Sequence, residues 1–103
     1  MAALHKALIH RAREIIRDPA SWTQTTAARD QLRQAISPRS IEARTFCAFG
    51  ALSKAAHEHG LSDRWLVDLF NPLSLSQLIR ANDSQNHTAV LALLVELEKE
   101  IDQ

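Results

Sequence analysis

The only cysteine, Cys47, lies between two phenylalanines in the stretch SPRSIEARTFCAFGAL, residues 37–52. A thiol becomes a useful nucleophile when a histidine, a basic neighbour or a helix N-terminus lowers its pKa and solvent can reach it. The residues beside Cys47 are apolar or small, and free cysteine is among the most buried residue types. We therefore interpret Cys47 as a small buried side chain, with a reactive thiol as the alternative.

Four polar residues are the strongest candidates for a ligand or partner site: Arg29, Asp30, Asn82 and Asp83. If the turn at 29–30 folds near a loop at 82–83, Arg29 can hold a carboxylate in a bidentate pair or present its guanidinium to an anionic ligand. The alternative is structural, because Asn and Asp favour turns and caps. On that view Arg29 and Asp83 only join two loops.

A basic stripe of Lys6, His10, Arg13 and Arg17 follows one face of the first predicted helix. Such a stripe can follow the phosphates of a nucleic acid, but it has no interleaved aromatic residues and no recognisable reading helix. A solvated helix face is the simpler interpretation.

The spacing of the histidines gives no metal site. His57 and His59 are two residues apart and His5 and His10 are five apart, whereas a helical metal pair needs a spacing of three or four. The two glycines are isolated, so there is no phosphate-cradling loop either. We expect no catalytic residue, no metal and no cofactor.

Length and charge restrict the class of protein. The chain has 103 residues, enough for one domain over 1–103, and its 12 basic side chains balance 12 acidic ones. Residues 1–44 carry eight basic and four acidic side chains, and residues 45–103 carry four and eight, which suggests a dipolar molecule. No apolar run is long enough for a membrane span or a signal peptide, and one cysteine fits a reducing compartment. We expect a cytoplasmic protein.

Helices dominate the predicted structure. Apolar residues recur at helical spacing over 3–17, and the Asp18-Pro19 pair closes this segment. A short helix is predicted after Ser62 as a cap, another around Leu75, Leu78 and Ile79, and a last one whose apolar stripe is Val90, Leu94, Leu97 and Ile101.

A central helix is predicted from near Ser40 to just before Gly60. Within it, Ile41, Phe46, Phe49 and Leu52 fall on one arc, whose large side chains should fill the main core, and Ala43, Cys47, Gly50 and Ala51 fall on the opposite side. Glycine inside a helix costs about 0.5–1 kcal/mol relative to alanine, so Gly50 needs a packing reason. We predict that another backbone comes close to this small face.

Several short motifs together resemble a known family. They are Trp22, ARD at 28–30, SPRSIEA at 37–43, Cys47 followed by GAL at 50–52, and ND at 82–83. In order and spacing they are similar, over roughly residues 8–101, to a family of small bacterial and phage proteins classed as a domain of unknown function. The resemblance implies a short hairpin after the ARD motif, at a position where the family usually has a glycine and this chain has Leu32 and Arg33. It implies no activity.

The predicted fold is mainly α: a small single-domain bundle of about four or five helices, with one short β-hairpin near 23–36. Local propensity alone favours a helix over 22–37, and this remains the alternative. The preferred function is a non-catalytic binding or adaptor module for a protein partner. The alternatives are a nucleic-acid-associated protein using Lys6, Arg13, Arg17, Arg33 and Arg39, and a small-ligand protein or enzyme around Arg29, Asp30, Cys47 and Asp83.

Overall fold

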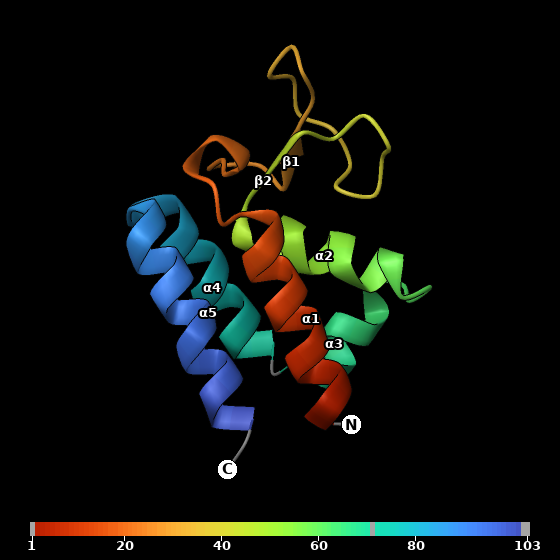
Figure 1. Ribbon diagram of the computed structural model, residues 1–103, viewed down its shortest axis with the longest axis vertical. Coiled ribbons are helices and arrows are strands. Elements are labelled where there is room, and N and C mark those ends of the chain that lie inside the picture. The colour runs from red at the N-terminus through yellow and green to blue at the C-terminus, as the bar shows by residue number, and fades with distance from the viewer. Residues whose placement is uncertain (1, 71, 102–103) are drawn as a thin grey trace.

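In the part of the chain that the structure describes, five α-helices form the body of the molecule, and the segment between the first two lies as a cap over one end of it (Figure 1). The computed structural model describes residues 2–70 and 72–101. The elements are α1 (Ala2–Ile15), the 3-10 helix η1 (Pro19–Ser21), strands β1 (Ala28–Arg29) and β2 (Thr45–Phe46), α2 (Ala48–Glu58), α3 (Arg64–Leu69), α4 (Pro72–Ser84) and α5 (His87–Ile101). The predicted mainly helical fold is confirmed.

Helix α1 lies between α2 and α5 and contributes the predicted apolar stripe to the core (Figure 1). Leu8, Ile9 and Ala12 are fully buried, as is Ile16 just after the helix. Asp18 then turns the chain, because its side chain accepts a hydrogen bond from the Ala20 amide at 2.9 Å and Pro19 opens η1. The first helix is therefore confirmed, with its end two residues earlier than predicted.

The C-terminal helices also follow the apolar pattern, with differences in extent. In α5, Val90 and Leu94 are fully buried, whereas the side chain of Ile101 lies outside the described residues. Helix α4 is longer than the short helix predicted around Leu75, Leu78 and Ile79, and Ile79 is 41% exposed.

Helix α3 has a different start from the predicted one. Ser62 does not cap it: the flanking residue is Asp63, whose side chain makes no capping hydrogen bond to the helix. The Asp63 carboxylate is instead engaged by other elements, as described below.

The predicted start of the central helix is wrong, because α2 begins at Ala48 and not near Ser40. The hydroxyls of Ser37 and Ser40 accept hydrogen bonds from the amides of Arg39 and Glu42, which favours turns over a helix. The backbone of Thr45–Phe46 is then used by the sheet. Ile41, predicted on the core face, is 89% exposed as a result.

The prediction of a close approach at Gly50 is confirmed. A Cβ atom at this position would lie 1.9 Å from the Ala27 carbonyl oxygen, so the cap backbone rests directly on α2. The predicted end of the helix is also confirmed, since Gly60 follows it with a φ of +73°.

A short hairpin is present near the predicted place. The Ile36 amide donates to the Ala28 carbonyl at 3.0 Å and the Asp30 amide donates to the Gln34 carbonyl at 2.9 Å, so the chain turns back within 28–36. The two-stranded sheet, however, is not formed by the two arms of this hairpin. It pairs β1 with β2 in antiparallel register, with Ala28 opposite Phe46. No helix forms over 22–37, and Arg33 occupies the turn with a φ of +65°.

Candidate binding site

Asn82 is a buried structural centre rather than an exposed ligand group. It lies in α4, not in a loop, and its side chain is fully buried. Its Oδ1 atom accepts from the Trp22 indole Nε1 at 2.7 Å and from the Ala48 amide at 2.9 Å, and its Nδ2 atom donates to the Thr23 carbonyl at 3.0 Å. One amide group thus joins the cap, the start of α2 and the end of α4.

Asp83, which is exposed, also joins the end of α4 to the cap. Its Oδ1 atom accepts from the Thr25 amide at 2.9 Å, and Gln24 Nε2 donates to the carbonyls of Asn82 and Gln85 at 3.0 and 3.1 Å. The end of α4 therefore holds residues 23–25 in place.

Arg29 contacts the same segment from the other side. Its Nε atom donates to Thr23 Oγ1 at 3.0 Å, its Nη2 atom donates to the Gln24 carbonyl and Thr25 Oγ1 at 3.4 and 3.2 Å, and its Nη1 atom donates to the Arg33 carbonyl at 3.0 Å. No ion pair joins Arg29 to Asp83 within residues 2–70 and 72–101. The two residues meet only through the turn that they both hold.

Asp30, the fourth predicted site residue, shapes the hairpin turn. Its Oδ1 atom accepts from the amides of Leu32 and Gln34, each at 2.9 Å. This is the local side-chain-to-backbone bonding for which aspartate is favoured in turns.

Cys47 is buried and flanks the first turn of α2. Its sulfur accepts a hydrogen bond from the Gly50 amide at 3.2 Å. Burial raises the pKa of the thiol and outweighs the opposite effect of nearby backbone amides. The expected burial of Cys47 is confirmed, and the group has the protonation preference of a poor nucleophile.

The basic stripe is partly neutralised by the last helix. Arg13 Nη1 lies 3.3 Å from Glu98 Oε1 of α5. His10, Arg13 and Arg17 also line a cavity of about 170 Å³ whose other wall is Leu91, Ala92 and Val95. Lys6 lies in α1 together with His10 and Arg13, whereas Arg17 lies beyond the end of that helix at Ile15.

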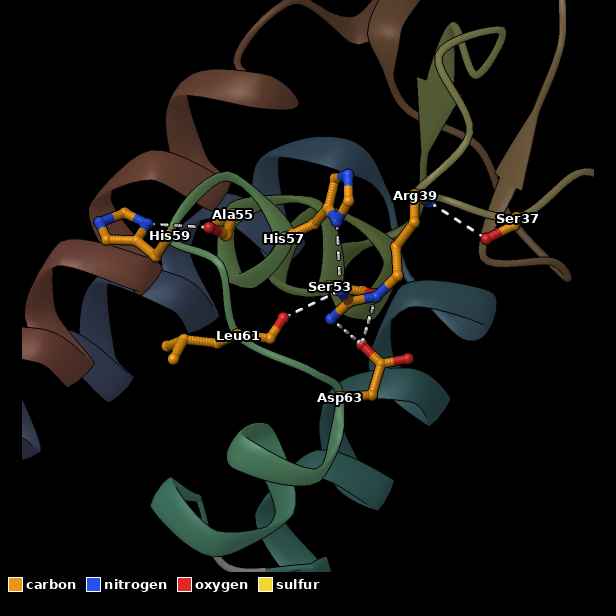
Figure 2. Close-up of polar contacts among 8 residues, drawn as sticks. All are labelled: Ser37, Arg39, Ser53, Ala55, His57, His59, Leu61 and Asp63. Atoms are coloured by element: carbon orange, nitrogen blue, oxygen red, sulfur yellow. Dashed lines mark hydrogen bonds and ion pairs between the residues drawn. The ribbon is translucent and has the colours of Figure 1, made fainter.

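Arg39 and Asp63 form a connection that the sequence analysis missed. Figure 2 shows the Arg39 guanidinium between the Asp63 carboxylate and the Leu61 carbonyl. Arg39 Nη2 and Nε lie 2.8 and 3.2 Å from Asp63 Oδ1, and Ser53 Oγ donates to the same oxygen at 2.6 Å. The SPRSIEA motif contained the signal, since it places an arginine in a turn between two serines.

These groups do not form a nucleophilic triad. The Ser53 hydroxyl donates straight to Asp63, while His57 faces Arg39 with its Nδ1 atom 3.4 Å from Arg39 Nη1 (Figure 2). A triad requires the histidine to receive the serine proton. The Asp63 pKa is lowered overall: burial, which raises it, is outweighed by the hydrogen bonds from Ser53 and Arg39. The cluster therefore anchors the 37–44 loop.

Two loops project from the cap (Figure 1). Each of them exposes a large apolar side chain to solvent. Leu32 in the first is 78% exposed, and Ile41 in the second is 89% exposed. A cleft of about 280 Å³ is lined by both loops, through Asp30, Gln31, Leu32, Glu42 and Arg44. We call residues 30–33 and 41–44 the two-loop surface. The sequence signal for this surface is an apolar residue inside a polar turn. For Ile41 this signal was hidden, because the helical spacing of the apolar residues predicts a core position for Ile41.

The described residues contain no group of three or more metal-binding side chains, and no helix among them has the length and apolar character needed to cross a membrane. The model of a family of unknown function, DUF6197, matches residues 2–100. Comparison with curated proteins and with solved structures gives no match.

Proposed function

The chain belongs to DUF6197, a family of unknown function, and we propose that it is a non-catalytic, cytoplasmic module that binds a protein partner through the two-loop surface. The observation that carries the proposal is the exposure of Leu32 and Ile41, 78% and 89%, on neighbouring loops. Burying such a side chain against a partner is worth about 1.5–3 kcal/mol.

The loops are held in fixed shapes before any partner binds. Asp30 bonds two amides of the first loop, and Arg39 attaches the second to Asp63 and to the Leu61 carbonyl. Less conformational entropy is lost when a surface is ordered in advance. The fixed shape of the loops supports a docking role for Leu32 and Ile41, whose side chains are not part of the core.

The composition of the surface favours a protein over a nucleic acid. Apolar tips are surrounded by both signs of charge, with Arg33 and Arg44 against Asp30 and Glu42. Apolar contacts with a mixed polar rim are typical of protein interfaces, whereas phosphate backbones select uniformly basic surfaces.

Photocrosslinking in the native cells tests this proposal. Benzoylphenylalanine is placed at Leu32 or at Ile41, and at Val67 as a control, because Val67 is 52% exposed on α3 at the opposite end of the molecule (Figure 1). We expect the same nuclease-resistant protein adduct from positions 32 and 41 and none from 67. Ile41→Ser should also abolish crosslinking from position 32.

The proposal is overturned by either of two results. One is the absence of a protein adduct at both loop positions. The other is crosslinking that does not depend on the two-loop surface: position 67 gives the same adducts as positions 32 and 41, or Ile41→Ser leaves crosslinking from position 32 unchanged.

A further inference from the structure

A second cleft lies between the hairpin turn and residues 22–25 and has an unbalanced charge. It has a volume of about 500 Å³ and is lined by Trp22, Thr23, Gln24, Thr25, Arg29 and Arg33. Two guanidinium groups belong to this lining, and no carboxylate does. The nearby acids Asp30 and Asp83 direct their bonded oxygens to the backbone amides of Leu32, Gln34 and Thr25.

The charge of Arg29 has no counterion among the described residues. All four of its side-chain hydrogen bonds go to neutral oxygens, from the hydroxyls of Thr23 and Thr25 and the carbonyls of Gln24 and Arg33. These bonds fix the position of the half-buried guanidinium without cancelling its charge. An uncompensated charge beside a cleft attracts an ion of opposite sign more strongly than a fully hydrated one does.

Arg33 has a guanidinium that is available to a ligand. Within residues 2–70 and 72–101 its side chain makes no hydrogen bond or ion pair, while its carbonyl is held by Arg29 at 3.0 Å. A planar guanidinium can bind a carboxylate or a phosphate with two parallel hydrogen bonds.

Backbone strain is concentrated at this cleft. Thr25 and Arg33 have φ values of +68° and +65°, and no other non-glycine residue in the described part of the chain has a positive φ. Both line the cleft, and Thr25 is β-branched, for which this conformation is a genuine outlier. Strained residues persist where surrounding contacts hold them, and they cluster at binding sites.

We propose that this cleft is an oxyanion-binding site, which takes a carboxylate or a phosphate group between the guanidinium of Arg33 and the fixed charge of Arg29. Arg33 belongs both to this cleft and to the two-loop surface, but the two proposals are tested separately, because anion binding is measured on the purified protein alone.

The test is an NMR titration of ¹⁵N-labelled protein, at constant ionic strength maintained with sodium chloride. Inorganic phosphate is added in one series and succinate in another. We expect saturable shifts of the amides of Thr25 and Arg33 and of the Arg29 Nε–H signal. Saturation by phosphate alone would assign the site to a phosphate-bearing ligand, and saturation by succinate alone would assign it to a carboxylate.

Two variants separate binding at the cleft from general charge effects. Arg33→Gly removes the guanidinium and retains easy access to the positive φ, so it should fold and bind at least about tenfold more weakly. Arg64→Gln removes one positive charge at the far end, on α3, and should bind as the wild type does (Figure 1).

Shifts that stay linear with both anions in the wild type would overturn the assignment. So would a Kd for Arg33→Gly equal to that of the wild type.

Discussion

Asn82 shows how much of the fold depends on one side chain. Three groups from two segments, the Trp22 indole and the Thr23 carbonyl of the cap and the Ala48 amide of α2, meet its side-chain amide. Each of these groups loses water on folding, and an unpaired buried polar group costs about 1–3 kcal/mol. Asn82 is therefore required for the fold, whether or not it also contributes to binding.

Asn82→Ala should lower the free energy of unfolding by about 3 kcal/mol or more, because three buried groups lose their partner. The matched control is Asn86→Ala, which removes the exposed hydrogen bond from the Ala89 amide to Asn86 Oδ1 and should cost about 1 kcal/mol. Urea unfolding of both variants measures the difference. Equal losses would contradict the central role of Asn82.

Cys47 should resist a disulfide reagent such as DTNB in the folded protein. Its burial and its raised pKa both reduce the thiolate available to solvent. We expect modification at neutral pH to be at least about 100-fold slower than in denaturant. Rapid modification of the native protein would show that Cys47 is a reactive thiol after all.

Helix α2 has its start defined by partners from elsewhere in the chain. Cys47 and Asn82 bond the amides of its first turn, and the Ala27 carbonyl rests where the Gly50 side chain would be. The helix and the cap are consequently a single packing unit, with no room for a methyl group between them.

Gly50→Ala should destabilise the protein by about 3 kcal/mol, since its Cβ would lie 1.9 Å from the Ala27 oxygen and the cap would have to move. Gly60→Ala is the control: its Cβ would meet nothing within 4 Å, so only the φ of +73° is unfavourable, at about 1 kcal/mol. Thermal melts of both proteins would check this order. A Gly50→Ala protein as stable as Gly60→Ala would refute the close contact.

The hairpin turn carries strain that a glycine would relieve. Arg33 has a φ of +65° and no side-chain partner among the described residues. Arg33→Gly should raise the free energy of unfolding by up to about 1 kcal/mol, as removal of αL strain outweighs the extra freedom of the unfolded chain.

Thr25→Gly provides the comparison for Arg33→Gly, because Thr25 has a similar φ of +68° but its hydroxyl accepts from Arg29. We expect no increase in the free energy of unfolding of this variant, measured by urea unfolding. A loss of stability in Arg33→Gly would contradict the strain argument.

At the scale of the whole molecule, the opposite charges of the two halves are brought together inside one fold. Arg11 pairs with Glu58, Arg13 with Glu98 and Arg39 with Asp63, so each pair joins the basic half to the acidic half. The uneven charge distribution in the sequence therefore serves internal pairing. The sequence suggested a molecule with a basic end and an acidic end. The three ion pairs explain the uneven charge distribution without such a separation.

These pairs predict a loss of stability in acid. The hydrogen bond from Arg11 lowers the pKa of Glu58, and the bonds from Ser53 and Arg39 outweigh burial to lower that of Asp63. A carboxylate with a lowered folded-state pKa stabilises the protein above its unfolded pKa, near 4, and this contribution is lost as the pH falls through the folded-state pKa.

The double variant Glu58→Gln, Asp63→Asn should be less stable than the wild type at pH 7 by about 1 kcal/mol, since both pairs are partly exposed. The difference should shrink towards zero as the pH falls from 5 to about 3. Urea unfolding at several pH values measures this, and a difference that stays constant would contradict the linkage.

Local patterns were sufficient for the parts of the fold that depend on local physics. The stripes of α1 and α5 follow from helical spacing, and the crowding at Gly50 follows from a glycine among small residues. The start of α2 was not predictable in this way, because its determinants are a strand pairing with Ala28 and a hydrogen bond that the Ala48 amide donates to Asn82. Extending the helix back to Ser40 placed Ile41 in the core by mistake.

The candidate site was predictable in composition but not in geometry. The motifs singled out Arg29, Asn82 and Asp83, and the fold does bring them to one turn, at 23–25. Nothing in the sequence indicated the positive φ values of Thr25 and Arg33, since both residue types usually avoid that conformation. The second cleft therefore becomes visible only in three dimensions.

The position of Asn82 late in the chain sets an order on assembly. Because synthesis proceeds from the N-terminus, Trp22, Thr23 and Ala48 leave the ribosome before the residue whose amide joins them. The cap and the first turn of α2 must wait, with their polar groups hydrated, until α4 has emerged. The docking of the cap onto the helical body is thus among the last steps of folding, whereas the bonds of Asp30 and Arg39 that shape the two projecting loops use residues that emerge earlier.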